Sequence, residues 1–511
     1  MKNTIDFFNK PKWFAAITAF IFGITIHLLG LLNFLHNYDD IAVLPAGYGT
    51  GLTSGRWALT VLGNFIKEYW GNYNLPFFNG VVFIVFIAAS AAFFVSTFNI
   101  KSRKASVLIG MLFVSFPTST STLFFKFTAT YYGFAIFLAV LAAWILEKYK
   151  YGFLISALFT AISLGIYQAY LPITVGMFVM LLIKHTLDND AKFFPTVRRG
   201  IYYCCNIIAG LLLYYIFLHL CLSHYKVELG NYQGISDMGN LSIGKLPILI
   251  WSSFKSFCMM PINDYCNLAQ TTLLKFSYFA LGAITILIIG FVLIAKRKNA
   301  SIWLLTILLC AVFPIAVNLI VIMCPSSYIY TLMVYSFVLV LCIPLVVFET
   351  LPSIEGVLGK IKKILWKAIA IVLSIVILSY SYLANLNYTT MHYSNRQIEN
   401  YLNSMITQVR MTEGFDTDKK WAIIGDLQDP LLTNAWQYVP TYGGNSDVYR
   451  LFNSYSQDCW IYNYLGYSIP FADEQTVLEI QKTEEYSNMP TWPNEGSIKI
   501  IDDIIVIKLQ K

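Results

Sequence analysis

Charged residues are scarce in this chain of 511 residues. Only 12% are Asp, Glu, Lys or Arg, whereas soluble domains carry roughly 25%. Hydrophobic residues make up 57% and the mean hydropathy is +0.60. These values exclude a soluble globular protein, and they also exclude disordered, collagen-like and coiled-coil chains.

Other signatures are missing as well. The sequence contains no nucleotide-binding loop and no cluster with metal-ligand spacing, although it leaves open a divalent ion at Asp39. Most of the nine cysteines lie in apolar runs, and only Cys459 lies in the last 125 residues. The cysteines therefore specify no disulfide framework.

The chain is instead rich in long apolar runs. A helix of roughly 20 apolar residues crosses the hydrocarbon core of a bilayer, and eleven runs approach that length. They hold almost no ionisable side chains, which argues against an ion-coupled pump. The expected spans are 13–35, 76–98, 105–124, 131–147, 152–167, 169–184, 201–222, 273–295, 302–323, 328–348 and 365–386.

Lys and Arg are distributed unevenly between alternate loops. The loops on one side hold eighteen of them and those on the other side hold six. Because cytoplasmic loops retain positive charge, the N-terminus is expected in the cytoplasm and the C-terminal segment outside. The chain has the look of a bacterial plasma-membrane protein. The basic excess faces membrane lipid on this view and does not indicate nucleic acid.

The sequence divides into two predicted parts. Residues 1–386 form the membrane unit, with 26 Lys and Arg against 12 Asp and Glu. Residues 387–511, with 9 against 16, are expected to form a small extracytoplasmic α+β domain. Its predicted elements are a helix at 397–411, a strand at 420–425, a helix near 474–484, and a hairpin of 497–501 and 504–509. Six aromatic residues of this domain either build its core or stack on glycan: Trp436, Tyr438, Tyr442, Trp460, Tyr462 and Tyr464.

Two adjacent carboxylates, Asp39 and Asp40, follow the first span directly. Neighbouring side chains point in different directions, about 100° apart on a helix, so the pair cannot straddle one bond as the two acids of a hydrolase do. One Asp can face a reacting centre while the other anchors the loop. The alternative is an ordinary solvated loop.

Two cations on the same predicted side of the membrane as Asp39 and Asp40 are candidate phosphate ligands. Arg56 follows a glycine-rich stretch, 47–51, and could bind a phosphate with two parallel hydrogen bonds, while Trp57 beside it could stack on a sugar. Lys126 could bind phosphate as a point charge. The alternative for all three is simple anchoring at the membrane interface.

Four further residues are candidate substrate contacts. Tyr167, Gln168 and Tyr170 lie at a turn between two short helices, where they could hydrogen-bond sugar hydroxyls. Alternatively, Gln168 only caps this helical hairpin. His224 could contact acceptor or phosphate, although such a residue is more often a solvated loop histidine.

Together these motifs resemble the GT-C fold glucosyltransferases of bacterial O-antigen serotype conversion, the Gtr type II group. The resemblance rests on Asp39-Asp40, on Ser-Gly-Arg-Trp at 54–57, on Phe-Pro-Thr at 116–118 and on Gly-Ile-Tyr-Gln-Ala-Tyr at 165–170. It covers about the first 390 residues. Members often carry an Arg a few residues after the acid pair, and here 41–45 is apolar, so Arg56 or Lys126 is the expected substitute.

The resemblance implies transfer of a hexose, expected to be glucose, from a polyprenyl-phosphate donor to a surface glycan, with inversion. Asp40, or failing it Asp39, would be the general base, and Arg56, then Lys126, would stabilise the departing phosphate. The rival functions are a flippase or transporter of lipid-linked sugars, a glycan polymerase or ligase, and a membrane scaffold that presents the C-terminal domain.

Overall fold

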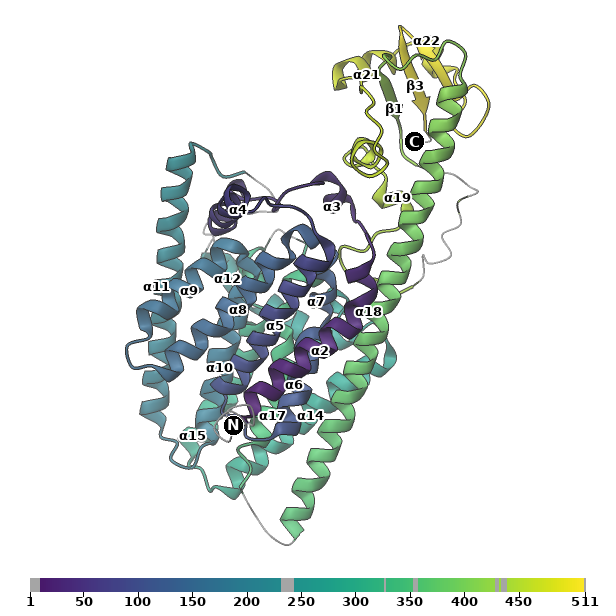
Figure 1. The fold of residues 1–511 in the computed structure, drawn as a ribbon. Coiled ribbons are helices and arrows are strands. Elements are labelled where there is room, and N and C mark those ends of the chain that lie inside the picture. The colour runs from purple at the N-terminus through teal and green to yellow at the C-terminus, as the bar shows by residue number, and fades with distance from the viewer. Residues whose placement is uncertain are drawn as a thin grey trace, which may run out of the picture.

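The computed structural model describes residues 10–230, 243–325, 328–352, 357–427, 432 and 439–509. Within them the protein is a bundle of helices carrying a small C-terminal sheet (Figure 1). The predicted fold class, a mainly α polytopic bundle with a small α+β part at its C-terminal end, is confirmed.

Nine helical segments in the described residues are long and apolar enough to cross a membrane. The chain is therefore a multi-span membrane protein. These segments are α2 (Pro11–Leu32), α5 (Pro76–Thr97), α6 (Arg103–Ser115) with α7 (Pro117–Thr122), α8 (Lys126–Lys148), η2 (Gln168–Tyr170) with α10 (Leu171–Leu187), α11 (Phe193–Tyr225), α14 (Thr272–Ala295), α15 (Ala300–Val317) and most of α18 (Val357–Met411).

Two of the eleven expected spans are shorter helices. The run at 152–167 forms α9 (Phe153–Ile166), which ends because Tyr167 adopts an extended backbone conformation. The run at 328–348 begins with the 3-10 turns η6 (Thr331–Met333) and η7 (Tyr335–Phe337), so α17 (Val338–Phe348) has only 11 residues. Apolar composition alone does not reveal such breaks in backbone conformation.

Short elements connect the long helices. They include α3 (Tyr38–Ala42), η1 (Leu52–Ser54), α4 (Trp57–Tyr69), η4 (Ile243–Lys245), α12 (Leu246–Cys258), α13 (Met260–Asn263), η5 (Tyr265–Asn267) and α16 (Ile320–Met323). Figure 1 shows α3 and α4 above one end of the bundle. We call this the apical end. The opposite, basal end is where α2 begins and α5, α8 and α10 end.

Contacts between loops define the basal end. Lys148 Nζ donates to Asn99 Oδ1 at 2.6 Å, and Lys296 Nζ donates to the Leu187 carbonyl at 2.7 Å.

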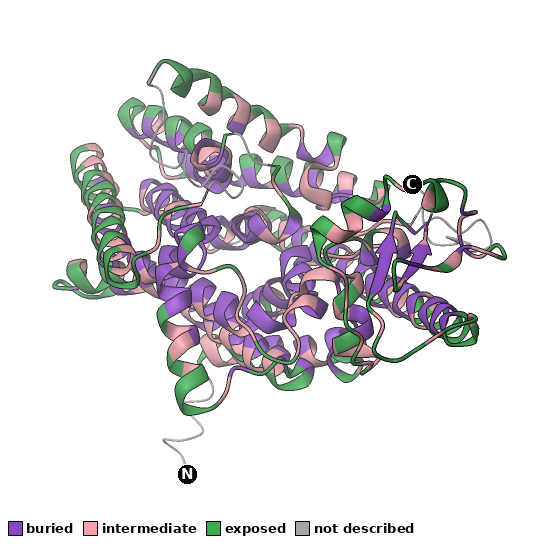
Figure 2. Ribbon diagram, turned by 90° about the horizontal axis from the view of Figure 1, so that it is seen from above, coloured by how far each residue is buried: buried purple, intermediate pink, exposed green. Residues whose placement is uncertain are grey.

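In the interior, small residues let helices approach closely: a Cβ on Gly110 would lie 2.4 Å from the Ala15 carbonyl oxygen. Figure 2 shows buried residues in the middle of the bundle and exposed ones around its rim, as expected for helices that face lipid.

Helix α18 connects the bundle to the C-terminal segment. It runs without interruption through residue 386 and leads to β1 (Trp421–Ile424), so the expected domain boundary falls inside a continuous helix. Strand β1 pairs in parallel with β3 (Ile504–Lys508), and β2 (Ile498–Ile501) pairs with β3 antiparallel, in the order β1-β3-β2.

The predicted strand at 420–425 and the predicted hairpin are confirmed. The hairpin turn is Asp502-Asp503, and both residues adopt positive φ, a conformation that Asp tolerates better than most residues. The predicted helix near 474–484 is α21 (Glu474–Ile480), followed by α22 (Glu484–Ser487). The remaining elements of this segment are α19 (Val448–Leu451), α20 (Gln457–Cys459) and the π-helical turn η8 (Trp460–Tyr464).

The aromatic residues of the C-terminal segment have different surroundings. Tyr442 and Trp460 are buried, whereas Tyr462 is 60% exposed. Tyr464 packs edge-on against His36, with 5.7 Å between ring centroids. Trp436 and Tyr438 lie outside the described residues. Trp460 therefore packs in the core of this segment, Tyr442 packs in the core of the bundle, and Tyr464 contacts the loop after α2.

Candidate active site

A cavity of about 940 Å³ lies at the apical end of the bundle. Its walls come from five parts of the chain: the loop after α2, the start of α8, the turn after α9, the segment at 330–332 and the C-terminal segment. Polar lining residues include Asp39, Arg56, Tyr132, Tyr167 and Tyr455.

The acid pair lies on the short helix α3, and its two carboxylates have different surroundings. The side chain of Asn37 caps α3 by accepting a hydrogen bond from the Asp40 backbone N–H at 2.7 Å. The Asp40 carboxylate is fully buried. Its Oδ1 accepts from Asn74 Nδ2 at 3.0 Å, and its Oδ2 lies 3.2 Å from His36 Nδ1. Asp40 therefore holds the loop together, whereas Asp39 lines the cavity.

The environment of Asp39 changes its acidity. Burial raises the pKa of its carboxyl group, and the neighbouring Asp40 carboxylate raises it further. A hydrogen bond from the Tyr455 hydroxyl opposes both effects, because it stabilises the charged form. Asp39 is thus a stronger base than an exposed aspartate. Tyr455, a residue of the C-terminal segment, limits the rise in its pKa.

Arg56 is held at the cavity wall by the turn that precedes α4. Gly55 adopts φ +70°, so the chain turns sharply there. Arg56 Nη1 donates to the Thr50 carbonyl and to the Tyr132 hydroxyl, each at 3.3 Å. Its guanidinium carbon lies 4.9 Å from the centre of the Tyr167 ring, a cation–π geometry. The cation is therefore oriented before any ligand binds.

Tyrosine rings form the wall behind Arg56. Tyr132 and Tyr167 stack, with 4.4 Å between centroids and 14° between planes. Tyr170 is fully buried behind them and packs edge-on, 5.1 Å from Tyr167 and 6.0 Å from Tyr132. Tyr132 and Tyr167 line the cavity, and Tyr170 supports them from the protein interior.

Gln168 and Trp57 lie next to this wall but are not among the residues that line the cavity. Gln168 is buried, and its Nε2 donates to the Ser54 carbonyl at 2.9 Å. It therefore fixes the turn that carries Arg56. Trp57 packs against Phe217 at 5.0 Å between centroids, and a Cβ on Gly165 would lie 2.5 Å from the indole.

The other two candidates also lie away from the cavity lining. Lys126 is buried at the start of α8, where its Nζ donates to the Leu35 carbonyl at 2.5 Å. His224 is exposed in the last turn of α11 and contacts the ring of Tyr225. The structure thus brings Asp39, Arg56 and Tyr167 together at one cavity and places Asp40, Lys126, Gln168 and Tyr170 around them.

Several residues of the site carried no signal in the sequence. Tyr132 lies in a run that is expected to be an ordinary span, and Tyr455 lies in a Tyr- and Asn-rich segment without a motif. The loop of Tyr455 is shaped by Asn453, whose Oδ1 accepts from the Tyr455 backbone N–H at 2.9 Å. In the described parts of the chain, no three His, Cys, Asp or Glu side chains are grouped to hold a metal ion.

The C-terminal segment is attached to this end of the bundle by several polar contacts. Asn463 Nδ2 donates to the Ile41 carbonyl at 3.0 Å, next to the acid pair. Asn395, on α18, exchanges two hydrogen bonds with the backbone of His36, at 2.8 and 2.9 Å. The Ser121 hydroxyl of α7 donates to the Gly443 carbonyl. These contacts hold the loop of Tyr455 over the cavity.

The fold and the cavity define a polytopic membrane protein with a polar, aromatic-walled site at one end of its bundle. The family model described as Glucosyl transferase GtrII matches residues 28–341. This match covers more than half of the chain, and the chain belongs to the GtrII glucosyl transferase family. Comparisons with curated proteins and with solved structures give no match. The matched region includes Asp39, Arg56, Tyr132 and Tyr167 but ends before Tyr455.

Proposed function

We propose that this protein transfers glucose from a polyprenyl-phosphate carrier to a surface glycan, with inversion at the anomeric carbon. Its membership of a glucosyl transferase family supports the transfer of a sugar. The observation that carries the mechanism is the cavity that Asp39 and Arg56 share. A carboxylate and an oriented guanidinium at one cavity are what a base and a phosphate ligand require.

In the proposed reaction a hydroxyl of the acceptor glycan attacks the anomeric carbon of the donor. The new glycosidic C–O bond forms as the bond between that carbon and the phosphate oxygen breaks. Asp39 accepts the hydroxyl proton, and the lipid phosphate departs with the bonding electron pair. A single displacement of this kind inverts the configuration.

Asp39 suits the role of base better than Asp40 does. It lines the cavity, and its raised pKa increases its affinity for a proton. The Asp40 carboxylate is fully buried and already accepts from Asn74. We therefore assign proton transfer to Asp39 and the anchoring of the loop to Asp40.

Arg56 suits the role of phosphate ligand better than Lys126 does. Its guanidinium is oriented by the Tyr167 ring and by the Tyr132 hydroxyl at the cavity wall. A preorganised cation stabilises the charge that develops on the leaving phosphate without having to reorganise. The Lys126 ammonium already donates to a carbonyl in the interior.

The side of the membrane follows from the distribution of charge. We propose that the apical end faces the extracytoplasmic side of a bacterial plasma membrane, with the N-terminus in the cytoplasm. The loops that the sequence assigns to one side hold eighteen Lys and Arg against six on the other side, and this difference supports the orientation. The C-terminal segment would then lie outside, as a separate unit beyond residue 386, where a surface glycan approaches.

Transfer of labelled glucose by the purified full-length protein tests the proposal. The donor is synthetic polyprenyl-phosphate-glucose, and the variants are Asp39→Asn and, as a matched control at the basal end, the exposed Asp190→Asn. We expect Asp39→Asn to lose at least 100-fold in kcat with its unfolding temperature unchanged, and Asp190→Asn to resemble the wild type. Wild-type turnover by Asp39→Asn would show that the assigned base is wrong. No transfer by the wild-type protein from this donor, to a cell-surface glycan extract, would overturn the donor assignment.

A further inference from the structure

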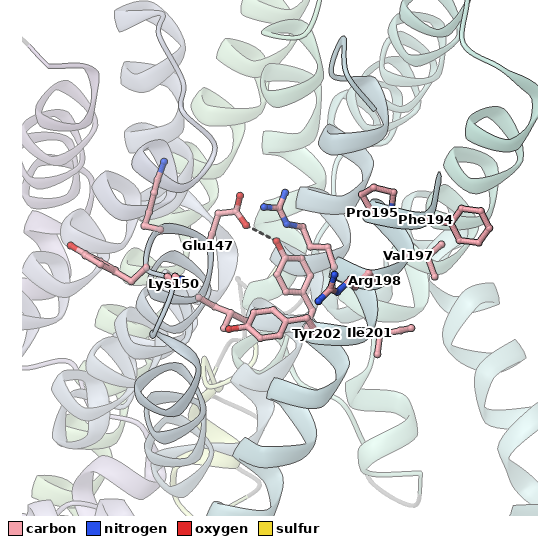
Figure 3. A pocket seen from close by; sticks show the side chains of 13 residues that line it. Glu147, Lys150, Phe194, Pro195, Val197, Arg198, Ile201 and Tyr202 are labelled. Carbon is pink, nitrogen blue, oxygen red and sulfur yellow. Dashed lines mark hydrogen bonds between the residues drawn. The ribbon is translucent and has the colours of Figure 1, made fainter. Parts of the chain in front are cut away.

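A second cavity, of about 820 Å³, lies at the basal end between the end of α8 and the start of α11. Figure 3 shows the side chains of these two segments around one space, with Glu147 and Lys150 on one side and Arg198, Ile201 and Tyr202 on the other. This cavity lies at the opposite end of the bundle from the candidate active site, and the proposed transfer reaction does not use it.

The lining of this cavity is strongly basic. It includes four cations, Lys148, Lys150, Arg198 and Arg199, and one carboxylate, Glu147. The carboxylate is already engaged, because it accepts from the Tyr203 hydroxyl at 2.6 Å and lies 3.4 Å from His185 Nε2. The cavity therefore has a positive potential that Glu147 offsets only in part.

Two of the four cations have partners inside the protein. Lys148 donates to Asn99 at 2.6 Å, and Arg199 Nη1 lies 2.7 Å from His185 Nε2. The other two, Lys150 and Arg198, are exposed. Neither takes part in the ion pairs of the described chain, and Lys150 lies 5.4 Å from the ring of Tyr151. Lys150 and Arg198 are therefore positioned to bind an anion from outside the chain.

The rim of the cavity is apolar and continues along one face of α11. Phe194 is 81% exposed and Ile201 is 60% exposed. Ile208 and Leu212 are also exposed. Ile208 follows Ile201 by seven residues and Leu212 follows Ile208 by four, so all three lie on the same helix face. An exposed apolar stripe on a membrane-spanning helix faces lipid chains. The cavity thus combines cations at the level of lipid headgroups with a path for acyl chains.

We propose that this cavity binds the headgroup of an anionic phospholipid, with its phosphate at Lys150 and Arg198 and its acyl chains along the exposed face of α11. Basic pockets between transmembrane helices are suited to such headgroups, and tyrosines such as Tyr149 and Tyr202 at the rim are typical of the membrane interface. A free phosphate ion would use the same cations but would gain nothing from the apolar stripe. The lipid is therefore the occupant that the whole cavity fits.

Lipid binding to the purified full-length protein in neutral detergent tests this proposal. Native mass spectrometry counts the retained lipid, and the unfolding temperature is measured in parallel with phosphatidylglycerol, phosphatidylcholine or inorganic phosphate. The pocket variant is Lys150→Gln with Arg198→Gln. The matched control is Lys101→Gln with Lys104→Gln, which removes two exposed cations from the same end of the bundle but outside the cavity.

We expect the wild type and the control to retain phosphatidylglycerol and to be stabilised by it. The pocket variant should bind it at least about tenfold more weakly, while phosphatidylcholine and inorganic phosphate have little effect. The unfolding transition without lipid shows whether the variant is folded. Equal losses of lipid affinity in both double variants would mean that general surface charge binds the lipid. Unchanged lipid binding by the pocket variant would show that the lipid does not bind in this cavity. An equal effect of inorganic phosphate would reject a lipid as the ligand.

Discussion

The hydrogen bond from Tyr455 to Asp39 makes a testable connection between the C-terminal segment and the proposed chemistry. The Tyr455 hydroxyl stabilises the charged form of the Asp39 carboxylate and so lowers its pKa, against burial and the Asp40 charge, which raise it. The Tyr455→Phe substitution removes this hydroxyl and keeps the ring. The pKa of Asp39 should rise, and the base should become protonated at a higher pH than in the wild type.

The size of this effect follows from the exposure of the two groups. A hydrogen bond to a charged group contributes about 1.5–3 kcal/mol when it is buried. Tyr455 is 60% exposed and Asp39 is only partly buried, so solvent weakens the bond and the lower end of this range applies. About 1.4 kcal/mol corresponds to one pKa unit. We therefore expect the acidic limb of the profile of kcat/KM against pH to move up by about one pH unit.

The assay is transfer of labelled glucose across a pH series. Well above the limb Asp39 is ionised in both proteins, so Tyr455→Phe should retain most of the wild-type rate, whereas below the limb it should be about tenfold slower. The control is Tyr462→Phe, which removes a hydroxyl from another tyrosine of the C-terminal segment that is 60% exposed and does not line the cavity. An acidic limb at the same pH in wild type and Tyr455→Phe would refute either the role of Asp39 as base or its coupling to Tyr455. Loss of rate at every pH would instead indicate that Tyr455 contacts a substrate.

Substitutions at three further positions probe the site. Arg56→Gln should lower kcat about 100-fold or more, because it removes the cation held against Tyr167. Arg56→Lys keeps the charge and should recover only part of that loss. Equal rates for the two variants would argue against a role for charge. Asp40→Ala should lower the free energy of unfolding by about 2–4 kcal/mol, because it leaves buried donors unsatisfied. The measurement is the unfolding temperature, which should fall. An unfolding temperature like that of Asp39→Asn would contradict the anchoring role of Asp40. Gly49→Ala should raise KM and lower the stability by about 1–3 kcal/mol. Gly49 has φ +90°, and the new Cβ would lie 2.9 Å from Thr128 Cγ2. Unchanged kinetics would mean that the cavity wall at Gly49 is easily deformed.

The elements predicted correctly from sequence are those that local pattern determines. The hairpin of 498–501 and 504–508 consists of β-branched runs on either side of two aspartates that tolerate positive φ, and the structure contains it as predicted. The spans at 152–167 and 328–348 are shorter than predicted, because the extended Tyr167 and the turns at 331–337 interrupt apolar runs that look uniform by composition. Such interruptions depend on packing partners that are distant in sequence.

The candidate site shows the same limit. The acid pair, Arg56 and Tyr167 could be nominated because they are polar or aromatic residues beside predicted spans. Nothing local distinguishes Tyr132 from other tyrosines of a span, or Tyr455 from its neighbours in a polar segment. Their place at the cavity depends on how α8 and the C-terminal segment pack against the loop after α2.

The sequence by itself determined that this is a bundle of membrane helices with an unequal distribution of cations between its ends. Both properties follow from the lengths of apolar runs and from counting charges, which requires no knowledge of contacts. Only the tertiary structure decided which of two adjacent carboxylates lines a cavity, because Asn74, a hydrogen-bond partner of the buried Asp40 carboxylate, comes from a separate loop between α4 and α5. It also decided that Tyr455, near the other end of the chain, reaches Asp39, because hydrogen bonding depends on proximity in space and not on position along the chain.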